Sequence, residues 1–340
     1  MANPNLRKSL VPVFFGCDAR FLRFTAVALR SLINNTSDDR RYHIHILHTD
    51  VPAELQREVL KMRKKNVSIT FEDVTADISD LVRGLPIRDY YSPSTYYRIV
   101  IASKFPQYNK AIYVDSDTVV VDDIAKLYDI NIGRNYIAAV PEAVTVAIPE
   151  AGRYTEEVLG IPCNRYFNAG VVVINCKEWR EHDVLRQFIQ LSNFYNFSVA
   201  QDQDYLNVIC KNRVYYLHRR WNMEAISEYP SINEKNYGII HYAFAAKPWH
   251  DINAPYGFYF WKYASQTYDF DAIKHIWADY TAEQLQAEAA VADKVIGLCL
   301  EEIANPKNYL RSMKQVKHGR FEAMFPLLNV VYGEAVRASI

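Results

Sequence analysis

Short apolar runs alternate with helix-like segments through the first half of the chain, and this alternation constrains the fold most. The segments between the first three runs repeat apolar residues at helical spacing. Because strands that alternate with helices usually pair in parallel, the pattern predicts an α/β fold with a mostly parallel sheet and helices on both faces. The apolar runs cover 11–15, 42–47, 67–71, 111–114, 137–140 and 170–174.

The strand pattern stops near the C-terminal end. Thr281 and Gln284 stand three residues apart, as in a capping box, and they open a helical pattern that Pro306 ends. We therefore predict an α/β domain over 8–268 and a helical appendage over 269–340, which packs on that domain or meets a membrane surface.

Glycine is scarce, and the spacing of the glycines excludes two common nucleotide-binding motifs. The chain has 11 glycines in 340 residues, and no two are closer than eight positions. Neither a Gly-x-Gly-x-x-Gly fingerprint nor a P-loop is therefore present. Basic and acidic side chains number 39 each, and the resulting zero net charge argues against a nucleic-acid partner.

The five cysteines are scattered, odd in number and without a Cys-x-x-Cys pair. This usage argues against a disulfide framework or a structural zinc site and fits a reducing compartment. The N-terminal segment lacks a signal-peptide pattern, and no apolar run approaches the ~20 residues of a membrane span. We therefore expect a cytoplasmic protein.

Acidic residues follow two of the apolar runs directly. Asp18 comes after 11–15, and Asp115-Ser116-Asp117 comes after 111–114. In α/β sheets, ligands bind at the carboxyl ends of the strands. Two carboxylates so close together form a compact oxygen-ligand site for Mn²⁺ or Mg²⁺. The alternative is an ordinary turn in which aspartates accept from backbone donors.

The histidines divide into one candidate ligand and several structural residues. His241 ends an apolar strand pattern, where it could be a third metal ligand, and Lys247 follows where it could meet a phosphate. The alternative is a hydrogen-bonded core histidine and a solvated lysine. Period-two alternation puts His43 and His45 on the outer face of their strand, so we expect no second metal site there.

Two further polar motifs are candidates for sugar binding. Gln201-Asp202-Gln203-Asp204 opens a helix, where its side chains could bind sugar hydroxyls or simply cap the helix. Asn168 precedes the run at 170–174, where it could face a cleft or serve a turn.

Taken together and in order, these motifs resemble glycosyltransferase family 8, above all the bacterial lipopolysaccharide and lipooligosaccharide galactosyl- and glucosyltransferases. The resemblance runs from about Val11 to Tyr263 and rests on VFFGCDARF, TYYR, AIYVDSD, YFNAGVVVIN, QDQDYLN and HYAFAAKPWH. It implies a GT-A fold, which is a Rossmann-like mixed sheet flanked by helices. It also implies a hexosyltransferase that uses a UDP-sugar and Mn²⁺ or Mg²⁺, and that retains the anomeric configuration.

The resemblance assigns roles by position. The metal ligands would be Asp115, Asp117 and His241. The donor nucleotide and sugar would meet Gly16, Asp18, Arg20, Arg98, Ser116 and Lys247. The acceptor pocket would include Glu142, Asn168, Ala169 and Asp204. Asp202 and Gln203 would be catalytic: either could form or shield an intermediate, unless the acceptor hydroxyl attacks from the same face.

This chain departs from the family pattern at one position near the metal histidine. The family usually has glycine three residues after that histidine, and here the residue is Phe244. A bulky side chain weakens the approach of a backbone amide to phosphate. An alternative function is therefore a UDP-sugar-binding protein without transfer activity. Another is a transferase whose acceptor is a protein or a polysaccharide primer.

Basic residues recur every three to four positions near the C-terminus, with no acid between Ala304 and Phe321. On one helix they would form a face for anionic lipid headgroups at the inner side of the plasma membrane, or a solvated face. Expected partners are thus a UDP-hexose, a glycan or glycolipid acceptor and a membrane surface. The basic residues are Lys307, Arg311, Lys314, Lys317 and Arg320.

Overall fold

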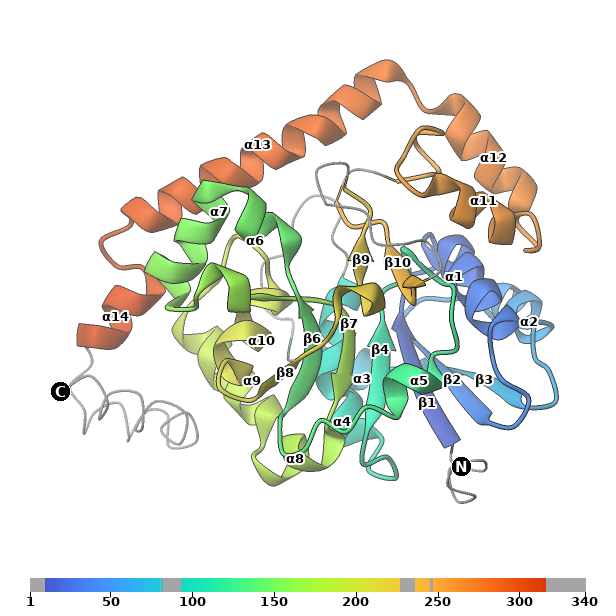
Figure 1. The fold of residues 1–340 in the computed structure, drawn as a ribbon, viewed down its shortest axis with the longest axis horizontal. Helices are drawn as coiled ribbons and strands as arrows, with labels where there is room; N and C mark the ends of the chain where they lie inside the picture. Colours follow the sequence, from blue (N-terminus) through green and yellow to red (C-terminus); the bar gives the residue numbers. More distant parts are fainter. Residues whose placement is uncertain (1–9, 80, 82–92, 227–235, 245–246, 316–340) are drawn as a thin grey trace.

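A computed structural model describes residues 10–79, 81, 93–226, 236–244 and 247–315. Among these residues, seven strands form a central sheet in the order β3-β2-β1-β4-β7-β6-β8 (Figure 1). Its strands are β1 (Leu10–Gly16), β2 (Arg41–His48), β3 (Val67–Asp73), β4 (Ala111–Val114), β6 (Ile137–Pro141), β7 (Phe167–Ile174) and β8 (Val214–Tyr216).

One strand of the described central sheet runs against the other six. β3, β2, β1 and β4 run parallel, as the strand–helix alternation predicts. β7 runs antiparallel to both β4 and β6, and β6 pairs in parallel with β8. Since β6 and β8 thus have the direction of β4, only β7 runs against the other strands of this sheet, and the mostly parallel sheet expected from the alternation is present. The sheet as a whole is mixed, as the family resemblance implies.

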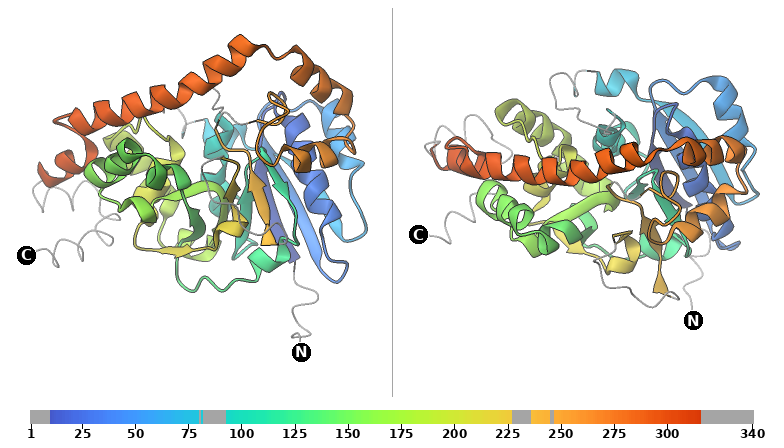
Figure 2. Two further views of the ribbon diagram at one scale, coloured as in Figure 1. Left: turned by 45° about the horizontal axis from the view of Figure 1, so that its top comes forward. Right: turned by 90° about the horizontal axis from the view of Figure 1, so that it is seen from above.

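Helices cover both faces of the sheet (Figure 2). Phe14 joins a core shared with α9 and α10, whereas Val13 and Phe15 point the other way into a core shared with α1 and α2. The flanking helices are α1 (Leu22–Asn34), α2 (Ala53–Leu60), α3 (Thr75–Ile78), α4 (Ile101–Lys104), α5 (Ala125–Tyr128), α6 (Ala143–Ala147), α7 (Pro149–Tyr154), α8 (Cys176–Glu181), α9 (Val184–Phe194) and α10 (Asp202–Cys210), with a 3₁₀ helix at Pro93–Val100.

A second, smaller sheet links the loop after β4 to the C-terminal half of the chain. It contains β5 (Thr118–Val120), β10 (Ile239–His241) and β9 (Met223–Glu224) in that order. β10 runs antiparallel to β5 and parallel to β9, so His241 lies opposite both Thr118 and Glu224. This pairing carries His241 to the carboxyl end of β4.

The C-terminal part is helical, with α11 (Gly257–Ala264), α12 (Phe270–Asp279), α13 (Ala282–Ala304) and α14 (Tyr309–Gln315). The predicted capping box is present: the Thr281 hydroxyl accepts from the backbone N–H of Gln284, and the Gln284 side-chain oxygen accepts from the backbone N–H of Thr281. α13 crosses the molecule from α12 to α7, against which it packs (Figures 1 and 2). The domain boundary at 268/269 stays a prediction.

Three of the five residues of the predicted basic face are described, and all three are exposed: Lys307, Arg311 and Lys314. α13 ends before Pro306, and the Arg311 guanidinium donates to the carbonyls of Ile303 and Asn305 at 3.1 and 2.7 Å, which terminates α13. Lys317 and Arg320 lie outside the described residues. Membrane contact through these side chains stays a prediction.

Within the described ranges, we find no helix with the length and apolarity that crossing a bilayer requires. The cytoplasmic location stays a prediction.

Candidate functional site

Two carboxylates and an imidazole meet at the carboxyl end of β4. Asp115 and Asp117 follow this strand, and β10 brings His241 to them across the small sheet. One ligand atom from each of the three residues lies within 4.8 Å of the others. Two carboxylate oxygens and an imidazole nitrogen suit Mn²⁺, which accepts both ligand types. The triad could therefore hold a divalent cation.

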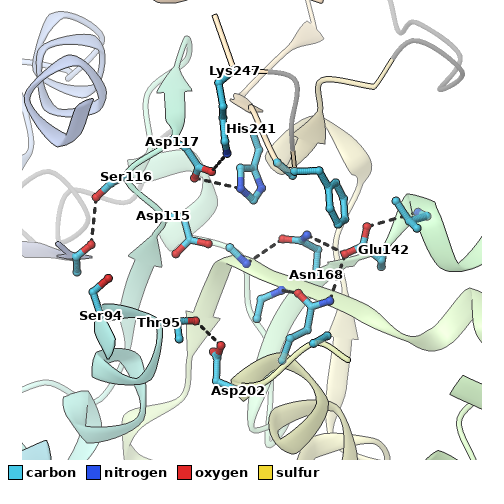
Figure 3. A pocket seen from close by; sticks show the side chains of 18 of the residues that line it. Ser94, Thr95, Asp115, Ser116, Asp117, Glu142, Asn168, Asp202, His241 and Lys247 are labelled. Atoms are coloured by element: carbon cyan, nitrogen blue, oxygen red, sulfur yellow. Dashed lines mark hydrogen bonds and ion pairs between the residues drawn. The ribbon is translucent and has the colours of Figure 1, made fainter. Parts of the chain in front are cut away.

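Asp117 is the most strongly paired member of the triad. Lys247 Nζ donates to its Oδ2 at 2.6 Å, and His241 Nε2 lies 3.2 Å from its Oδ1 (Figure 3). Burial raises the pKa of Asp117, but Lys247 and His241 outweigh burial and hold that pKa below its ordinary value. Asp117 is therefore ionised at neutral pH, as a metal ligand must be.

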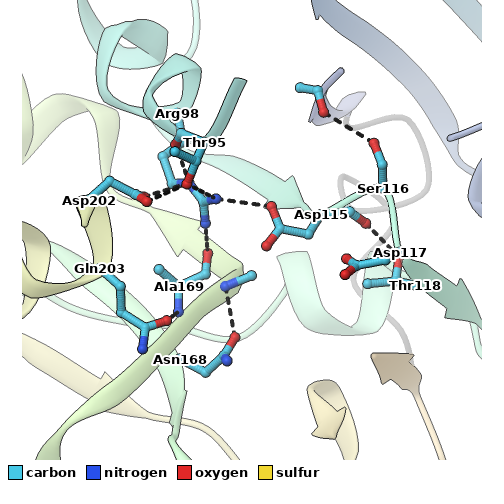
Figure 4. Close-up of polar contacts among 12 residues, drawn as sticks. Thr95, Arg98, Asp115, Ser116, Asp117, Thr118, Asn168, Ala169, Asp202 and Gln203 are labelled. Atoms are coloured by element: carbon cyan, nitrogen blue, oxygen red, sulfur yellow. Dashed lines mark hydrogen bonds and ion pairs between the residues drawn. The ribbon is translucent and has the colours of Figure 1, made fainter. Parts of the chain in front are cut away.

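Arg98 joins the triad to the neighbouring wall of the cavity (Figure 4). This buried guanidinium lies 3.0 Å from Asp115 Oδ1 and 3.1 Å from Asp202 Oδ2, and it also donates to the carbonyl of Ala169. Burial raises the pKa of Asp202 to about 6, against the opposing charge of Arg98. Thr95 donates to the same carboxyl group. Arg98 thus fixes two acids on opposite sides of itself.

A second polar group lies beside the triad and could bind sugar hydroxyls. Glu142 Oε2 accepts from Asn168 Nδ2 at 2.9 Å and from Gln203 Nε2 at 3.2 Å. Gln203 Oε1 accepts from Ala169 N at 2.9 Å, so this amide is held at both ends. Glu142, Asn168, Ala169 and Gln203 all line the cavity.

The residues expected at the donor nucleotide also line this cavity. Ser116 Oγ donates to the carbonyl of Gly16 at 3.1 Å and thereby ties β1 to the loop after β4. Asp18 accepts from Phe21 N at 2.8 Å, which orients the start of α1. Arg20 lies 3.7 Å from Asp18, and its side chain is 90 % exposed at the cavity mouth.

Asp204 does not line this cavity, in contrast to the role the resemblance assigns to it. The side chain is fully buried behind the wall, where it accepts from the hydroxyls of Tyr154 and Tyr166 at 2.9 and 2.7 Å and from Ala200 N at 2.8 Å. Burial raises its pKa to about 6. With both oxygens occupied, Asp204 supports the start of α10 rather than a ligand.

Three buried residues near the triad were not assigned a role from the sequence. Gly170 lies under the triad, where an added Cβ would stand 2.3 Å from His241 Cε1. Asn222 contacts His241, and Glu224 lies beside the carboxyl group of Glu142. Burial, and then the charge of Glu142, raise the pKa of Glu224 well above its ordinary value.

Gly170 lies within YFNAGVVVIN, one of the motifs on which the family resemblance rests, two residues after Asn168. This position is a weak sequence signal that Gly170 belongs to the site. Asn222 and Glu224 lie in a three-residue 3₁₀ helix cap and a two-residue strand. Neither element has a periodic pattern, so one sequence offers no signal for either residue.

Phe244 has a left-handed backbone conformation, the region that favours glycine. Its φ is +59°, a value that bulky residues rarely adopt, and the residue lines the cavity. This is the position at which the family resemblance leads us to expect glycine.

All of these cavity residues surround one space of about 750 Å³. α13 contributes Glu288, Val295 and Cys299 to its lining. The Glu288 carboxylate lies 2.9 Å from His250 Nδ1, in the segment after Lys247. The C-terminal helices therefore help to enclose the cavity that holds the triad.

Comparisons with known proteins agree with this architecture. The sequence model described as Glycosyl transferase family 8 matches residues 12–253. The chain is 26 % identical over 271 residues to the lipopolysaccharide 1,2-glucosyltransferase of Escherichia coli, covering 74 % of this chain and 75 % of the relative. It is 26 % identical over 260 residues to the lipopolysaccharide 1,3-galactosyltransferase of Salmonella typhimurium, covering 71 % and 74 %.

A solved structure shows the same fold. Galactosyltransferase LgtC in complex with donor and acceptor sugar analogues is similar with a TM-score of 0.63 and 24 % identity, over 76 % of this chain and 96 % of that chain. The GT-A fold expected from the sequence is thereby confirmed. Because the family match spans more than half of its residues, the chain belongs to glycosyl transferase family 8.

Proposed function

We propose that this glycosyltransferase moves a hexose from a UDP-sugar to a glycan acceptor, with retention at the anomeric carbon and with a bound Mn²⁺ or Mg²⁺. One observation carries the proposal: Asp115, Asp117 and His241 meet within 4.8 Å in the cavity, with Lys247 on the same carboxylate as His241. A divalent cation beside a lysine suits a diphosphate leaving group in a chain that lacks glycine-rich loops.

Some residues of the site act on the leaving group, and others bind the sugar. A bound cation supplies Lewis-acid stabilisation of the charge that develops on the β-phosphate. Lys247 adds a second positive charge beside the β-phosphate, because its ammonium group already lies at the triad. Arg98 holds Asp115 and Asp202 in place. Glu142, Asn168 and Gln203 offer carboxylate and amide groups to sugar hydroxyls.

A panel of UDP-sugars tests this function. UDP release from UDP-galactose, UDP-glucose and UDP-N-acetylhexosamines is measured with Mn²⁺, Mg²⁺ or EDTA. We expect metal-dependent release from at least one UDP-hexose and loss of release in EDTA. Binding of UDP-sugars without release in any metal would support the binding-protein alternative. Absence of all binding would contradict both functions.

We further propose that the acceptor has an apolar portion, as a glycolipid does. The part of the cavity beneath α13 is lined by Val144, Ala151, Val199, Val295 and Cys299. The hydroxyl groups of Tyr154 and Thr155 in this part already donate hydrogen bonds within the protein. Tyr154 donates to Asp204 and Thr155 donates to the carbonyl of Gly152, both at 2.9 Å. This end therefore has few free partners for sugar hydroxyls and suits an alkyl chain.

Val295→Asn tests the apolar end. We expect the KM for an alkyl glycoside acceptor to rise about tenfold, because burying an amide in place of a branched alkyl group costs on the order of 1–2 kcal/mol. The KM for the UDP-sugar is expected to stay unchanged. The control is Leu300→Asn, on the same helix but 44 % exposed, which is expected to leave both KM values unchanged. Equal KM values of the wild type for alkyl and free glycosides would contradict the proposal.

A further inference from the structure

Four buried side chains form a continuous hydrogen-bonded line from the triad to the candidate sugar-binding group. His241 Nδ1 lies 2.9 Å from Asn222 Oδ1, and Asn222 Nδ2 donates to Asn168 Oδ1 at 2.8 Å. Asn168 Nδ2 donates to Glu142 Oε2 at 2.9 Å. Figure 3 shows Asn168 between Glu142 and the triad. None of the four is more than 5 % exposed, so water does not compete for these bonds.

A backbone amide fixes the direction of the whole line. Gly170 N donates to Asn168 Oδ1 at 2.8 Å, and because a backbone N–H can only donate, that side-chain atom must be the oxygen. The Asn222 atom facing this oxygen must then be its NH₂ group. The remaining atom of Asn222, facing His241, must be its carbonyl oxygen.

The same logic decides the tautomer of His241. Since Asn222 presents an oxygen acceptor, the Nδ1 of His241 must carry the hydrogen. The Nε2 atom lies 3.2 Å from Asp117 Oδ1 within the triad, and it is the nitrogen left to offer its lone pair to a bound cation. A metal-ligating imidazole needs this state, with one nitrogen held by a hydrogen bond and the other unprotonated.

We propose that Asn222 is a positioning residue that holds His241 in the Nδ1–H tautomer and couples the metal site to the sugar-binding pair of Asn168 and Glu142. The metal half of this inference rests on the proposed function. The alternative is a buried asparagine that serves folding alone, so the test needs readouts that a loss of stability does not move.

The first readout is the ring nitrogens of His241. In ¹⁵N-histidine-labelled protein without metal, NMR distinguishes the protonated from the unprotonated nitrogen, and a His241→Gln variant assigns the signals. We expect a protonated Nδ1 in the wild type; in Asn222→Ala, where Asp117 is the remaining partner of the ring, we expect part of the population to carry its hydrogen on Nε2 alone. The second readout is Mn²⁺ affinity by EPR, which we expect to fall about 10- to 100-fold in Asn222→Ala.

Two further variants separate positioning from folding. Asn207 is equally buried, at 1 % exposure, and its amide bonds only the backbone of Phe167 and Gln203, so Asn207→Ala is the matched control. It is expected to lower stability but to leave the tautomer and Mn²⁺ affinity unchanged. Asn222→Asp still accepts from His241 but cannot donate to Asn168. It is expected to keep Mn²⁺ affinity while raising the KM for a sugar substrate.

The outcomes are distinguishable. The positioning role of Asn222 is overturned if Asn222→Ala keeps the wild-type tautomer of His241 and binds Mn²⁺ as tightly as Asn207→Ala does. If the wild type binds no divalent cation, the proposed metal function fails, while the tautomer comparison still decides whether Asn222 fixes His241.

Discussion

Asp117→Asn is expected to lower the rate of hexose transfer at least about a thousandfold, which corresponds to a loss of about 4 kcal/mol of transition-state stabilisation. Lys247 and His241 both converge on Asp117: one oxygen meets Lys247 at 2.6 Å and the other lies 3.2 Å from His241. Asparagine removes the negative charge but keeps the shape. The cation loses a ligand, and Lys247 loses the carboxylate that holds it. The measurement is the steady-state rate at saturating UDP-sugar and Mn²⁺, with Mn²⁺ affinity by calorimetry.

Asp122→Asn is the matched control for this substitution. Asp122 is also an ion-paired carboxylate, lying 2.7 Å from both Lys126 and Arg220, but it is outside the cavity lining. Its loss is expected to change the rate less than about twofold, because exposed ion pairs contribute little. A rate of Asp117→Asn within about tenfold of the wild type would contradict a metal role for Asp117.

The acidic part of the site was predictable because it depends on local sequence. Asp115 and Asp117 follow an apolar strand, and strands of an α/β sheet present their carboxyl ends to ligands. The approach of His241 is different, since it depends on the antiparallel pairing of β10 with β5. No pattern in either strand specifies that long-range partner, so the strand pattern left His241 open between a metal ligand and a core histidine, and the family resemblance assigned it to the metal.

One wrong prediction has a clear physical cause. His45 was expected on the outer face of its strand, but it is 2 % exposed and stacks on Phe14 with ring centroids 4.6 Å apart. Burial lowers the pKa of His45 to about 4, so the ring is neutral. Alternation marks two faces of a strand, but in a parallel sheet helices cover both. The polar face of β2 is therefore inside.

The buried acids were the least predictable part of the site. Glutamates are ordinarily surface residues, so the sequence alone does not predict that Glu224 is buried. Its burial follows from its place in the short strand β9 and beside Glu142, which only the structure shows. Asp204 shows the converse: the sequence groups it with Asp202, but α10 turns it behind the wall toward two tyrosines. Neighbours in sequence on a helix face different directions.

Gly170→Ala is expected to abolish Mn²⁺ binding and transfer together. The constraint is space: a Cβ at this position would lie 2.3 Å from His241 Cε1, 2.7 Å from Asp115 Oδ2 and 3.0 Å from Asn168 Oδ1. The strand cannot withdraw, because Gly170 O accepts from Asp115 N at 2.7 Å and Gly170 N donates to Asn168 at 2.8 Å. The imidazole must therefore rotate, which takes Nε2 away from the carboxylates.

We expect Mn²⁺ affinity of Gly170→Ala to fall at least about 100-fold, the upper range for disturbing the support of a metal ligand. Val172→Ala is the control, since it lies on the same strand and faces the core rather than the cavity. That variant loses packing and stability but is expected to bind Mn²⁺ as the wild type does. Normal Mn²⁺ affinity in Gly170→Ala would mean that His241 is not a ligand in this position. Loss of affinity in both variants would instead trace the effect to β7 as a whole, so the two together separate the ligand from its scaffold.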